Sequence, residues 1–379
     1  MILEDALGLL LAHAGPRGWE YVEVGEGLIG RVLAEDISPA SDVPRAHVCA
    51  KDGYLVRADG PWPGDARIVG ECGPGETAGH IGPGEAIEAY SGCLVEDDRA
   101  ALVPAEEVRP SRGLVSIGRK PEALENLIPR GSGARAGEAV LRRGHAITPL
   151  DVELLEMLGR RYARVYRRPS VAAISVGSEI SLEAPSRTTR YLTVGGIVRA
   201  LGGDFLNMGV VGDSPSAIAS AVEEALAFAD LVVTLGGTGP SARDVTYEAI
   251  RSLGPSEAFR GIDVADAARS GGAVVRGKPV LMLPGPRVPA LNGAVLLLAP
   301  LVTASAGSAE KPYRVIRARI EGEVSPPRRE MVWIRLEGGV AHPIRPDYYG
   351  VSLSAADGYF LGGPGEVGEE VEVHLPRFL

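Results

Sequence analysis

A polar, glycine-rich loop at residues 234–246, TLGGTGPSARDVT, contains residue types that bind phosphate. It follows an apolar run and precedes a segment with helical spacing, so backbone N–H groups and a helix N-terminus would both face a bound anion. The candidate anion-binding residues are Gly236, Gly237, Thr238, Gly239 and Ser241. Asp244 would bind a metal, or together with Thr246 simply begin the helix.

Two further acidic residues follow runs that have the composition of strands. Glu179 lies in residues 175–180, SVGSEI, and Asp213 lies in residues 212–215, GDSP. Glu179 would complete a Mg²⁺ site with Asp244, since Mg²⁺ binds a few protein oxygens together with phosphate oxygens. Asp213 is a candidate cofactor-binding residue, with the N-cap of the following helix as the alternative.

Basic residues gather in residues 276–287, RGKPVLMLPGPR. Guanidinium and ammonium donors beside turns that expose backbone amides suit a tetrahedral oxyanion such as molybdate, tungstate or phosphate. The alternative is a set of ordinary exposed cations. The candidate residues of this stretch are Arg276, Lys278, Pro284, Gly285 and Arg287.

The elements that would position these loops lie in residues 168–306, where β-branched runs alternate with amphipathic helices. The run DLVVTLGG, for example, follows the helical segment SPSAIASAVEEALAFA. This alternation is typical of a doubly wound, mostly parallel sheet with helices on both faces. Ligands bind at the carboxyl ends of such strands, so we expect the loops to meet at one edge of the sheet.

The remaining sequence predicts three further parts. Residues 36–133 carry short alternating strands broken by Gly and Pro, which predicts a β-rich inserted domain of barrel or half-barrel type. Residues 1–35 and 134–167 predict a split helical domain, in which residues 25–37 form a helix and Thr148 caps another. Residues 307–379 predict a small C-terminal β domain.

Composition argues against several classes of protein. The 379 residues carry a net charge of −10, which disfavours a nucleic-acid footprint. No apolar run approaches the roughly 18 residues of a membrane span, and the acidic N-terminus lacks the basic region of a signal peptide, so we expect a cytoplasmic protein without a membrane partner. The spacing of Cys49, Cys72 and Cys93 supports neither a disulfide framework nor a thiolate metal site, and we expect buried free thiols.

Taken in order, these motifs resemble the molybdopterin molybdenumtransferase family, the MoeA or gephyrin E-domain group, over essentially the whole chain. The motifs are AKDGYLVR from residue 50, RAGEAVLRRGHAITP from residue 135, RRPSVAAISVGSE from residue 167, the GGTG loop, RGKP, LPG and the tail motif SLSAADG. The resemblance implies a split helical domain with a β insertion, a MogA-like α/β domain and a C-terminal β domain. It also implies a homodimer with an active site shared between subunits.

The resemblance further implies a Mg²⁺-dependent reaction in which molybdate or tungstate is inserted into adenylylated molybdopterin and AMP is released. Asp52, Asp244 and Lys278 match catalytic positions of the family, Glu179 and Asp244 match metal ligands, and Asp213 matches an acid of its DD pair. The implied partners are a second copy of the chain, the pterin nucleotide and other cofactor-biosynthesis proteins.

The chain also departs from the family pattern. Residues 131–133 are GSG where the family has GED, residues 177–179 are GSE where it has GDE, and Val275 replaces an expected lysine. Arg190, Arg276 and Arg287 would supply replacement charge. The glycine loop resembles that of MogA-type molybdopterin adenylyltransferases more closely, so adenylylation of molybdopterin with ATP and a non-catalytic pterin-binding scaffold are the alternative functions.

Overall fold

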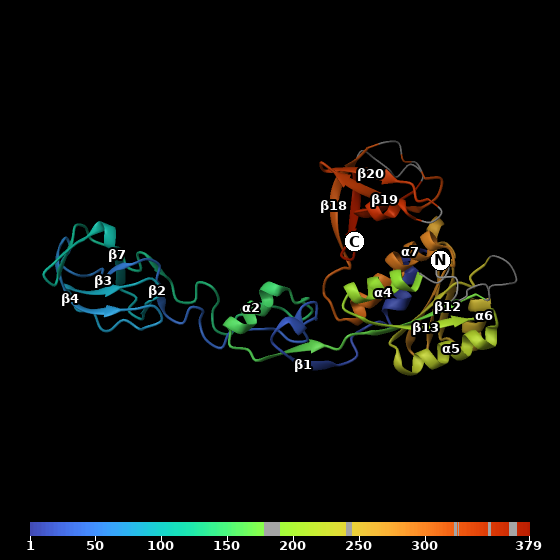
Figure 1. Cartoon of the computed structure of the whole chain (residues 1–379), viewed down its shortest axis with the longest axis horizontal. Helices are drawn as coiled ribbons and strands as arrows, with labels where there is room; N and C mark the ends of the chain where they lie inside the picture. The colour runs from blue at the N-terminus through green and yellow to red at the C-terminus, as the bar shows by residue number, and fades with distance from the viewer. Residues whose placement is uncertain (178–189, 240–244, 322–323, 325, 348–349, 364–369) are drawn as a thin grey trace. The chain divides into compact units, whose positions relative to one another are not determined.

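The computed structural model describes residues 1–177, 190–239, 245–321, 324, 326–347, 350–363 and 370–379. The chain forms two compact units, Met1–Glu35 with Arg143–Leu379, and Asp36–Arg142. The second unit is drawn in blue to green in Figure 1 and consists mainly of strands. Residues 134–142, which the sequence analysis assigns to the split domain, cluster with this inserted unit.

The inserted unit is built from short strands, in agreement with its broken alternating pattern. A six-stranded sheet has the order β7-β3-β5-β4-β9-β8, and a three-stranded sheet has the order β10-β2-β6. The elements are β2 His47–Cys49, β3 Gly53–Arg57, β4 Gly64–Cys72, β5 Glu85–Ala89, β6 Leu94–Val95, β7 Ala100–Pro104, η2 Ala105–Glu107, β8 Arg109–Ser111, β9 Leu114–Ile117 and β10 Leu127–Ile128. Successive side chains on a strand point to opposite faces, so Leu55 and Val56 of β3 enter different apolar clusters.

Cys72 and Cys93 form a disulfide, which corrects the prediction of free thiols. The two residues are 21 positions apart, and their Cα atoms lie 5.8 Å from each other. Cys72 ends β4 and Cys93 follows β5, so the bond depends on the pairing of these two strands. Cys49 is a buried free thiol, as predicted.

The first and last parts of the split segment form one small substructure. Its elements are β1 Trp19–Glu23, η1 Glu26–Leu28, α2 Pro149–Met157 and β11 Tyr162–Tyr166, with β1 and β11 antiparallel. Helix α1 Leu3–Leu11 instead packs in the core of the α/β domain through Leu3, Ala6 and Leu10. Thr148 caps α2 as predicted and forms a capping box with Asp151. The predicted helix over residues 25–37 is wrong: after η1 the chain makes isolated bridges between Val32 and Ala146 and between Leu33 and Val165. Pairing with distant segments outweighs the local helical spacing.

A six-stranded sheet of order β13-β12-β14-β17-β16-β15 forms the α/β domain, which confirms the predicted fold class. The first four strands are parallel, and β16 is antiparallel to both of its neighbours, β17 and β15, so β15 runs in the same direction as the first four. The strands are β12 Ser170–Val176, β13 Asp204–Val211, β14 Leu231–Leu235, β15 Glu257–Arg260, β16 Gly271–Val275 and β17 Lys278–Leu283. The helical elements are α4 Arg190–Ala200, α5 Pro215–Phe228, α6 Val245–Ser252, η3 Ala265–Ala267, α7 Arg287–Gly293, the π-helical η4 Ala294–Leu298 and α8 Ala299–Ser305.

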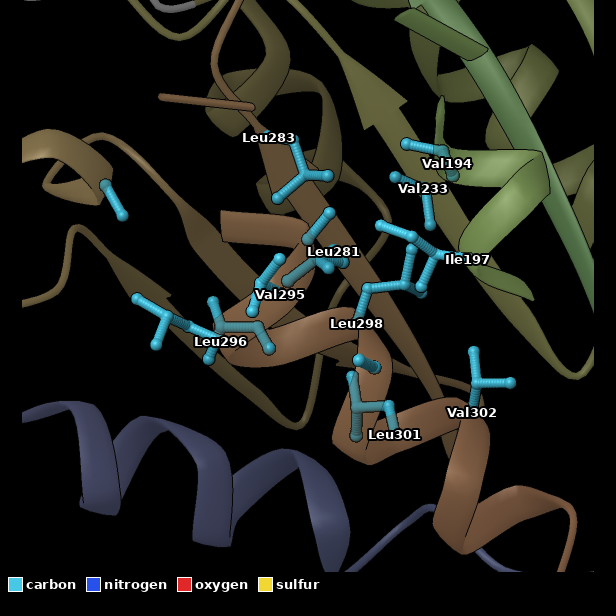
Figure 2. Close-up of a cluster of buried hydrophobic side chains, with 14 of the residues drawn as sticks. Val194, Ile197, Val233, Leu281, Leu283, Val295, Leu296, Leu298, Leu301 and Val302 are labelled. Carbon is cyan, nitrogen blue, oxygen red and sulfur yellow. The ribbon is translucent and has the colours of Figure 1, made fainter. Parts of the chain in front are cut away.

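Apolar side chains cover both faces of this sheet. Val233 of β14 packs in the cluster that contains the helix Arg287–Ser305, whereas Val232 packs against α5 and α6 on the other face. Figure 2 shows the first cluster, with Leu298 among the side chains that surround Val233 and Leu281. The helix Arg287–Ser305 has the length and composition of a membrane span, but its apolar window is 72% buried, as expected for the core helix of a domain.

Five C-terminal strands close into a barrel of order β18-β20-β19-β21-β22. The elements are β18 Tyr313–Ile320, β19 Glu330–Glu337, β20 Val340–Ile344, η5 Ser352–Ala355, β21 Gly358–Gly362 and β22 Glu370–Pro376. Val332 and Ile334 of β19 pack in the barrel cluster, whereas Met331 and Trp333 join the core of the α/β domain. Because side chains alternate along β19, the barrel and the α/β domain share a continuous apolar contact.

Candidate functional site

Neighbouring strand ends bring the predicted loops to one edge of the α/β sheet. β12, β14 and β17 are adjacent and parallel, so Gly177, Gly236 and Pro284 follow them at the same edge. The Gly236 N–H donates to the Leu283 carbonyl oxygen at 3.0 Å. A Cβ atom added to Gly285 would lie 3.8 Å from the Cα of Gly236. The loops after β14 and β17 are therefore in van der Waals contact.

The loop after β14 requires glycine at two successive positions. Gly236 has φ +114°, and a Cβ there would lie 2.3 Å from the Val176 carbonyl oxygen. Gly237 has φ +67°, and a Cβ there would lie 2.3 Å from the Thr246 hydroxyl oxygen. That hydroxyl donates to the Gly236 carbonyl oxygen at 3.0 Å, which ties the loop to the start of α6. The close packing fixes the backbone of the loop.

The next three residues of this loop, Gly237 to Gly239, present successive backbone N–H groups. No described residue accepts a hydrogen bond from the N–H of Gly237, Thr238 or Gly239. Thr238 is buried, with 9% of its surface exposed. Successive N–H groups in a glycine-rich turn form a concave surface suited to an anion.

Arginines surround this edge of the sheet. Arg190, at the start of α4, donates to the Gly285 carbonyl oxygen. Arg260, at the end of β15, donates to the Gly239 carbonyl oxygen at 3.3 Å, and its guanidinium lies 5.9 Å from the centroid of the Tyr247 ring. Arg287 begins α7 and is exposed. Guanidinium groups are suited to bidentate contacts with phosphate and other oxyanions.

A cavity of about 390 Å³ opens beside this edge. Arg190 and Arg287 line it together with apolar residues of α4 and α7, and the segment at Gly350 and Ser354 closes another side. The tail motif identified in the sequence therefore contributes to the cavity. A Cβ on Gly350 would lie 3.3 Å from a methyl carbon of Val288, so the tail segment packs closely against α7. A mostly apolar wall with two cations suits a flat ring that carries phosphate.

The structure does not bring Lys278 and Arg276 together with this edge. Lys278 begins β17 and Leu283 ends it, so Lys278 lies roughly 16 Å away at the opposite edge of the sheet. Its ammonium group donates to the carbonyl oxygens of Leu226 and Ala229, at 2.7 and 2.8 Å, where α5 ends. Arg276 pairs with Glu223. Both side chains stabilise helix α5 at this place in the fold.

Three predicted site residues lie outside the described residues: the acids Glu179 and Asp244, and Ser241 of the glycine loop. Asp213 is exposed and follows β13, the neighbour of β12, so it belongs to the same edge. The N-cap of α5 is Ser214, so the alternative role of Asp213 as N-cap is wrong. Within the described ranges, no group of three His, Cys, Asp or Glu side chains is arranged to hold a metal ion.

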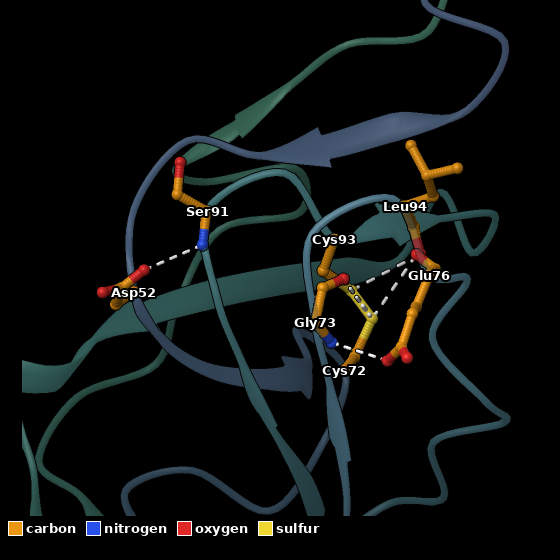
Figure 3. Close-up of a disulfide and its surroundings, with 7 residues drawn as sticks. All are labelled: Asp52, Cys72, Gly73, Glu76, Ser91, Cys93 and Leu94. Atoms are coloured by element: carbon orange, nitrogen blue, oxygen red, sulfur yellow. Dashed lines mark hydrogen bonds between the residues drawn. A yellow bond between two sulfur atoms is a disulfide. The ribbon is translucent and has the colours of Figure 1, made fainter.

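Asp52 lies in the inserted unit, directly before β3. Its carboxylate accepts a hydrogen bond from the Ser91 N–H at 2.8 Å, and its carbonyl oxygen accepts one from the Ala105 N–H at 3.2 Å. The residue is exposed. Figure 3 shows that the turn carrying Ser91 also carries Cys93 of the disulfide.

Arg260 is a residue of this edge that was not predicted from the sequence. Its segment, EAFR, is too short to show a periodic pattern, and its position at the sheet edge depends on antiparallel pairing with β16. The signal available in the sequence was a strand-like segment that ends in arginine immediately before Gly261. The structure places the Arg260 guanidinium beside the glycine loop. Arg276 and Lys278 were the residues predicted to bring positive charge to these loops.

Comparisons with known proteins agree on one family. Residues 1–159 match the model of the MoeA N-terminal region (domain I and II), and residues 172–304 match that of a probable molybdopterin binding domain. A molybdopterin biosynthesis protein of Methanocaldococcus jannaschii is 26% identical, with 93% of this chain and 91% of the relative covered. A molybdopterin molybdenumtransferase of Nostoc is 25% identical, with 69% of this chain and 61% of the relative covered.

Solved structures with a similar fold come from Pyrococcus horikoshii. One molybdopterin biosynthesis MoeA protein superposes with a TM-score of 0.83 at 28% identity, and the match covers 100% of this chain and 99% of the other. A second superposes with a TM-score of 0.85 at 25% identity over 99% of both chains. The likeness therefore extends over the inserted unit, the α/β domain and the barrel.

Proposed function

This chain belongs to the molybdopterin molybdenumtransferase family, and on that premise we propose that it inserts molybdate or tungstate into adenylylated molybdopterin and releases AMP. The observation that carries the proposal is the sheet edge where the glycine loop meets the Pro284–Gly285 turn and three guanidinium groups. This edge combines N–H donors, positive charge and an adjoining apolar cavity, which are the groups that a phosphorylated pterin requires.

In this proposal the residues of the edge bind and position the substrate. The N–H groups of Gly237, Thr238 and Gly239 bind a phosphate of the pterin nucleotide, and Arg260 and Arg287 bind the remaining negative charge. Water attacks a phosphorus of the pyrophosphate, so that a new P–O bond forms on the pterin phosphate as the bond to AMP breaks. The negative charge that develops on the leaving AMP phosphate is stabilised by fixed guanidinium groups, and the water proton passes to solvent. The same donors hold the metal oxyanion near the dithiolene, which makes the transfer effectively intramolecular.

The family resemblance also implies Mg²⁺. The expected ligands are Glu179, two positions after Gly177, and Asp244, directly before Val245, and Asp213 is a described carboxylate at the same edge of the sheet. Carboxylate oxygens are the ligands that Mg²⁺ prefers, so this donor set fits the ion. When bound, Mg²⁺ would offset phosphate charge. We also assign the Asp52 carboxylate, from the inserted unit, a part in the reaction.

A homodimer is part of the proposal, and the split segment offers a surface for it. Trp19, Tyr21 and Tyr162 lie on one face of the β1–β11 sheet with exposed fractions of 51%, 61% and 45%. Exposed aromatic groups on one face are typical of protein interfaces. A Tyr21→Ser variant should shift the mass measured by light scattering from dimer to monomer; a monomeric native chain would contradict this part of the proposal.

One assay separates the possible functions of the family site. The purified chain is incubated with adenylylated molybdopterin, Mg²⁺ and molybdate or tungstate, and AMP and metal-loaded pterin are quantified. Release of AMP with metal insertion supports the proposal. In a parallel incubation with ATP, Mg²⁺ and free molybdopterin, consumption of ATP identifies an adenylyltransferase instead, as the form of the GGTG loop allows. Tight pterin binding without turnover in either incubation identifies a scaffold.

A second experiment tests the sheet edge itself. Arg260→Ala should lower kcat/KM for AMP release about 10- to 100-fold, because a charge-assisted contact to phosphate is worth roughly 1.5–3 kcal/mol. Arg251→Ala is the matched control, since Arg251 is exposed at the far end of α6. Equal activity of the two variants would remove Arg260 from the site.

A further inference from the structure

The carboxylate of Asp52 receives its hydrogen bond from a turn that is itself fixed. Asp52 is exposed, so its side chain has several rotamers in water, and the bond from the Ser91 N–H at 2.8 Å selects one of them. The turn contains residues 90–93. Its conformation therefore decides where the Asp52 carboxylate points.

Backbone contacts attach this turn to the segment that carries Asp52. The Gly92 N–H donates to the Cys49 carbonyl oxygen at 2.9 Å, and the Cys49 N–H donates to the Cys93 carbonyl oxygen at 2.9 Å. Gly92 has φ +93°, a backbone conformation that residues other than glycine rarely adopt. Asp52 is three residues beyond Cys49, so the turn and the acid share one short ladder of hydrogen bonds.

The opposite side of the turn is attached to β4. The Tyr90 N–H donates to the Cys72 carbonyl oxygen at 3.0 Å, and the Cys72–Cys93 disulfide adds the covalent link between turn and strand, as Figure 3 shows. β4 is an inner strand of the six-stranded sheet. The disulfide therefore connects the donor of the Asp52 hydrogen bond to the rigid part of the inserted unit.

The surroundings protect this bond from exchange. Cys72 and Cys93 are 1% and 0% exposed, so a solvent thiol has little access to either sulfur. Cys49 lies in the same apolar cluster, and its burial raises the pKa of its thiol to about 11. Because only a thiolate attacks a disulfide, this raised pKa makes Cys49 a poor nucleophile towards its neighbours at neutral pH.

We propose that the Cys72–Cys93 disulfide is a positioning element for Asp52, acting through the Ser91 N–H. The disulfide touches no substrate; it keeps the turn 90–93 in the conformation that orients the carboxylate. The inference rests on the proposed function only in assigning Asp52 a part in turnover.

The first test measures the turn directly in the full chain. In the double variant Cys72→Ala/Cys93→Ala, hydrogen exchange of the Ser91 amide should be at least about 10-fold faster than in the native chain, because the turn opens more often. Cys49→Ala is the matched control: this residue is buried in the same cluster without a disulfide, and its variant should keep the native Ser91 rate. Unchanged Ser91 exchange in the double variant would overturn the proposal.

The second test asks whether the disulfide acts through Asp52. The double cysteine variant should lose several-fold in kcat/KM for AMP release, and the same substitutions in an Asp52→Asn background should cause no further loss. If the cysteine substitutions lower kcat/KM by the same factor in the Asp52→Asn background as in the native chain, the disulfide does not act through Asp52. If Asp52→Asn alone keeps full activity, the assignment of Asp52 in the proposed function fails, whereas the Ser91 exchange result stands by itself.

A chemical route covers the case in which the double variant does not fold. Because both sulfurs are buried, the chain is incubated for a long time with excess dithiothreitol, which reduces the disulfide during local opening; Cys72 and Cys93 each gain a hydrogen, and the reagent closes to its cyclic disulfide. Mass spectrometry after alkylation confirms the state of each cysteine. Faster Ser91 exchange in the reduced chain supports the proposal, and an unchanged rate, or alkylation of both cysteines before reduction, overturns it.

Discussion

Replacing Trp333 with phenylalanine removes a buried hydrogen bond between the barrel and the α/β domain. The Trp333 indole N–H donates to the Asn292 side-chain oxygen at 2.9 Å. Trp333 is 1% exposed and Asn292 is 0% exposed. The amide nitrogen of Asn292 has no partner within the described part of the chain, and neither has the hydroxyl of the buried Ser270. Asn292 therefore depends on Trp333 for its single side-chain hydrogen bond among these residues.

The magnitude follows from this geometry. Trp333→Phe leaves the Asn292 oxygen buried without a donor, which costs about 1–3 kcal/mol, and the smaller ring leaves a cavity that costs about 1 kcal/mol more. Asn292→Leu leaves the indole N–H without a partner but removes the amide nitrogen that already lacked one, so its net cost should be within about 1 kcal/mol of zero.

The double variant Trp333→Phe/Asn292→Leu distinguishes this account from simple loss of volume. It removes every polar atom of the pair, so it should be more stable than Trp333→Phe alone, with a coupling energy of about 2 kcal/mol. Urea unfolding of the full chain followed by circular dichroism measures the effect. Trp333→Phe should lower the midpoint by on the order of 1 M or less.

Two results would refute the reasoning. If the double variant shows the sum of the single costs, the two side chains do not depend on each other in the folded chain. If Trp333→Phe costs less than about 1 kcal/mol, the Asn292 oxygen has found another donor or is not desolvated.

Three further predictions concern local features. Thr148→Ala should lower stability by about 1 kcal/mol in urea unfolding, because it removes the capping box of α2. The Arg119 guanidinium lowers the pKa of the Glu125 carboxyl to about 2, so this pair contributes stability above about pH 4.5 that is lost as the pH falls towards 2. In Glu125→Gln the urea unfolding midpoint should therefore depend less on pH between about 4.5 and 2. The same pH dependence in the variant and the native chain would contradict this prediction. Gly237→Ala should abolish pterin binding measured by calorimetry, because its Cβ would clash with the Thr246 hydroxyl, and native-like affinity would show that the loop adapts.

The sequence alone was sufficient for the α/β domain because the determining interactions there are local and repeated. Each parallel strand needs apolar residues on both faces, and each helix needs one apolar face, so the alternation is visible along the chain. The glycines at positions 236 and 237 were found for a similar reason, since a tight approach of backbone to backbone excludes every other residue type.

The same reasoning failed where pairing between distant segments decides the outcome. The spacing of residues 25–37 favours a helix, but bridges from Val32 and Leu33 to residues more than 100 positions away take its place. The predicted cation site is divided for a related reason: β17 is only six residues long, yet it separates Lys278 at one edge of the sheet from Gly285 and Arg287 beyond the other.

The sequence therefore determined which loops we propose for phosphate binding, because glycines and polar residues at strand ends are a local requirement of anion binding. The tertiary structure decided which cations accompany them. Arg260 stands beside the glycine loop only because β15 pairs antiparallel with β16, and Cys93 meets Cys72 only because β4 and β5 are neighbours. Strand order and direction are set by the total burial of apolar surface, a property of the whole fold that no short stretch of sequence contains.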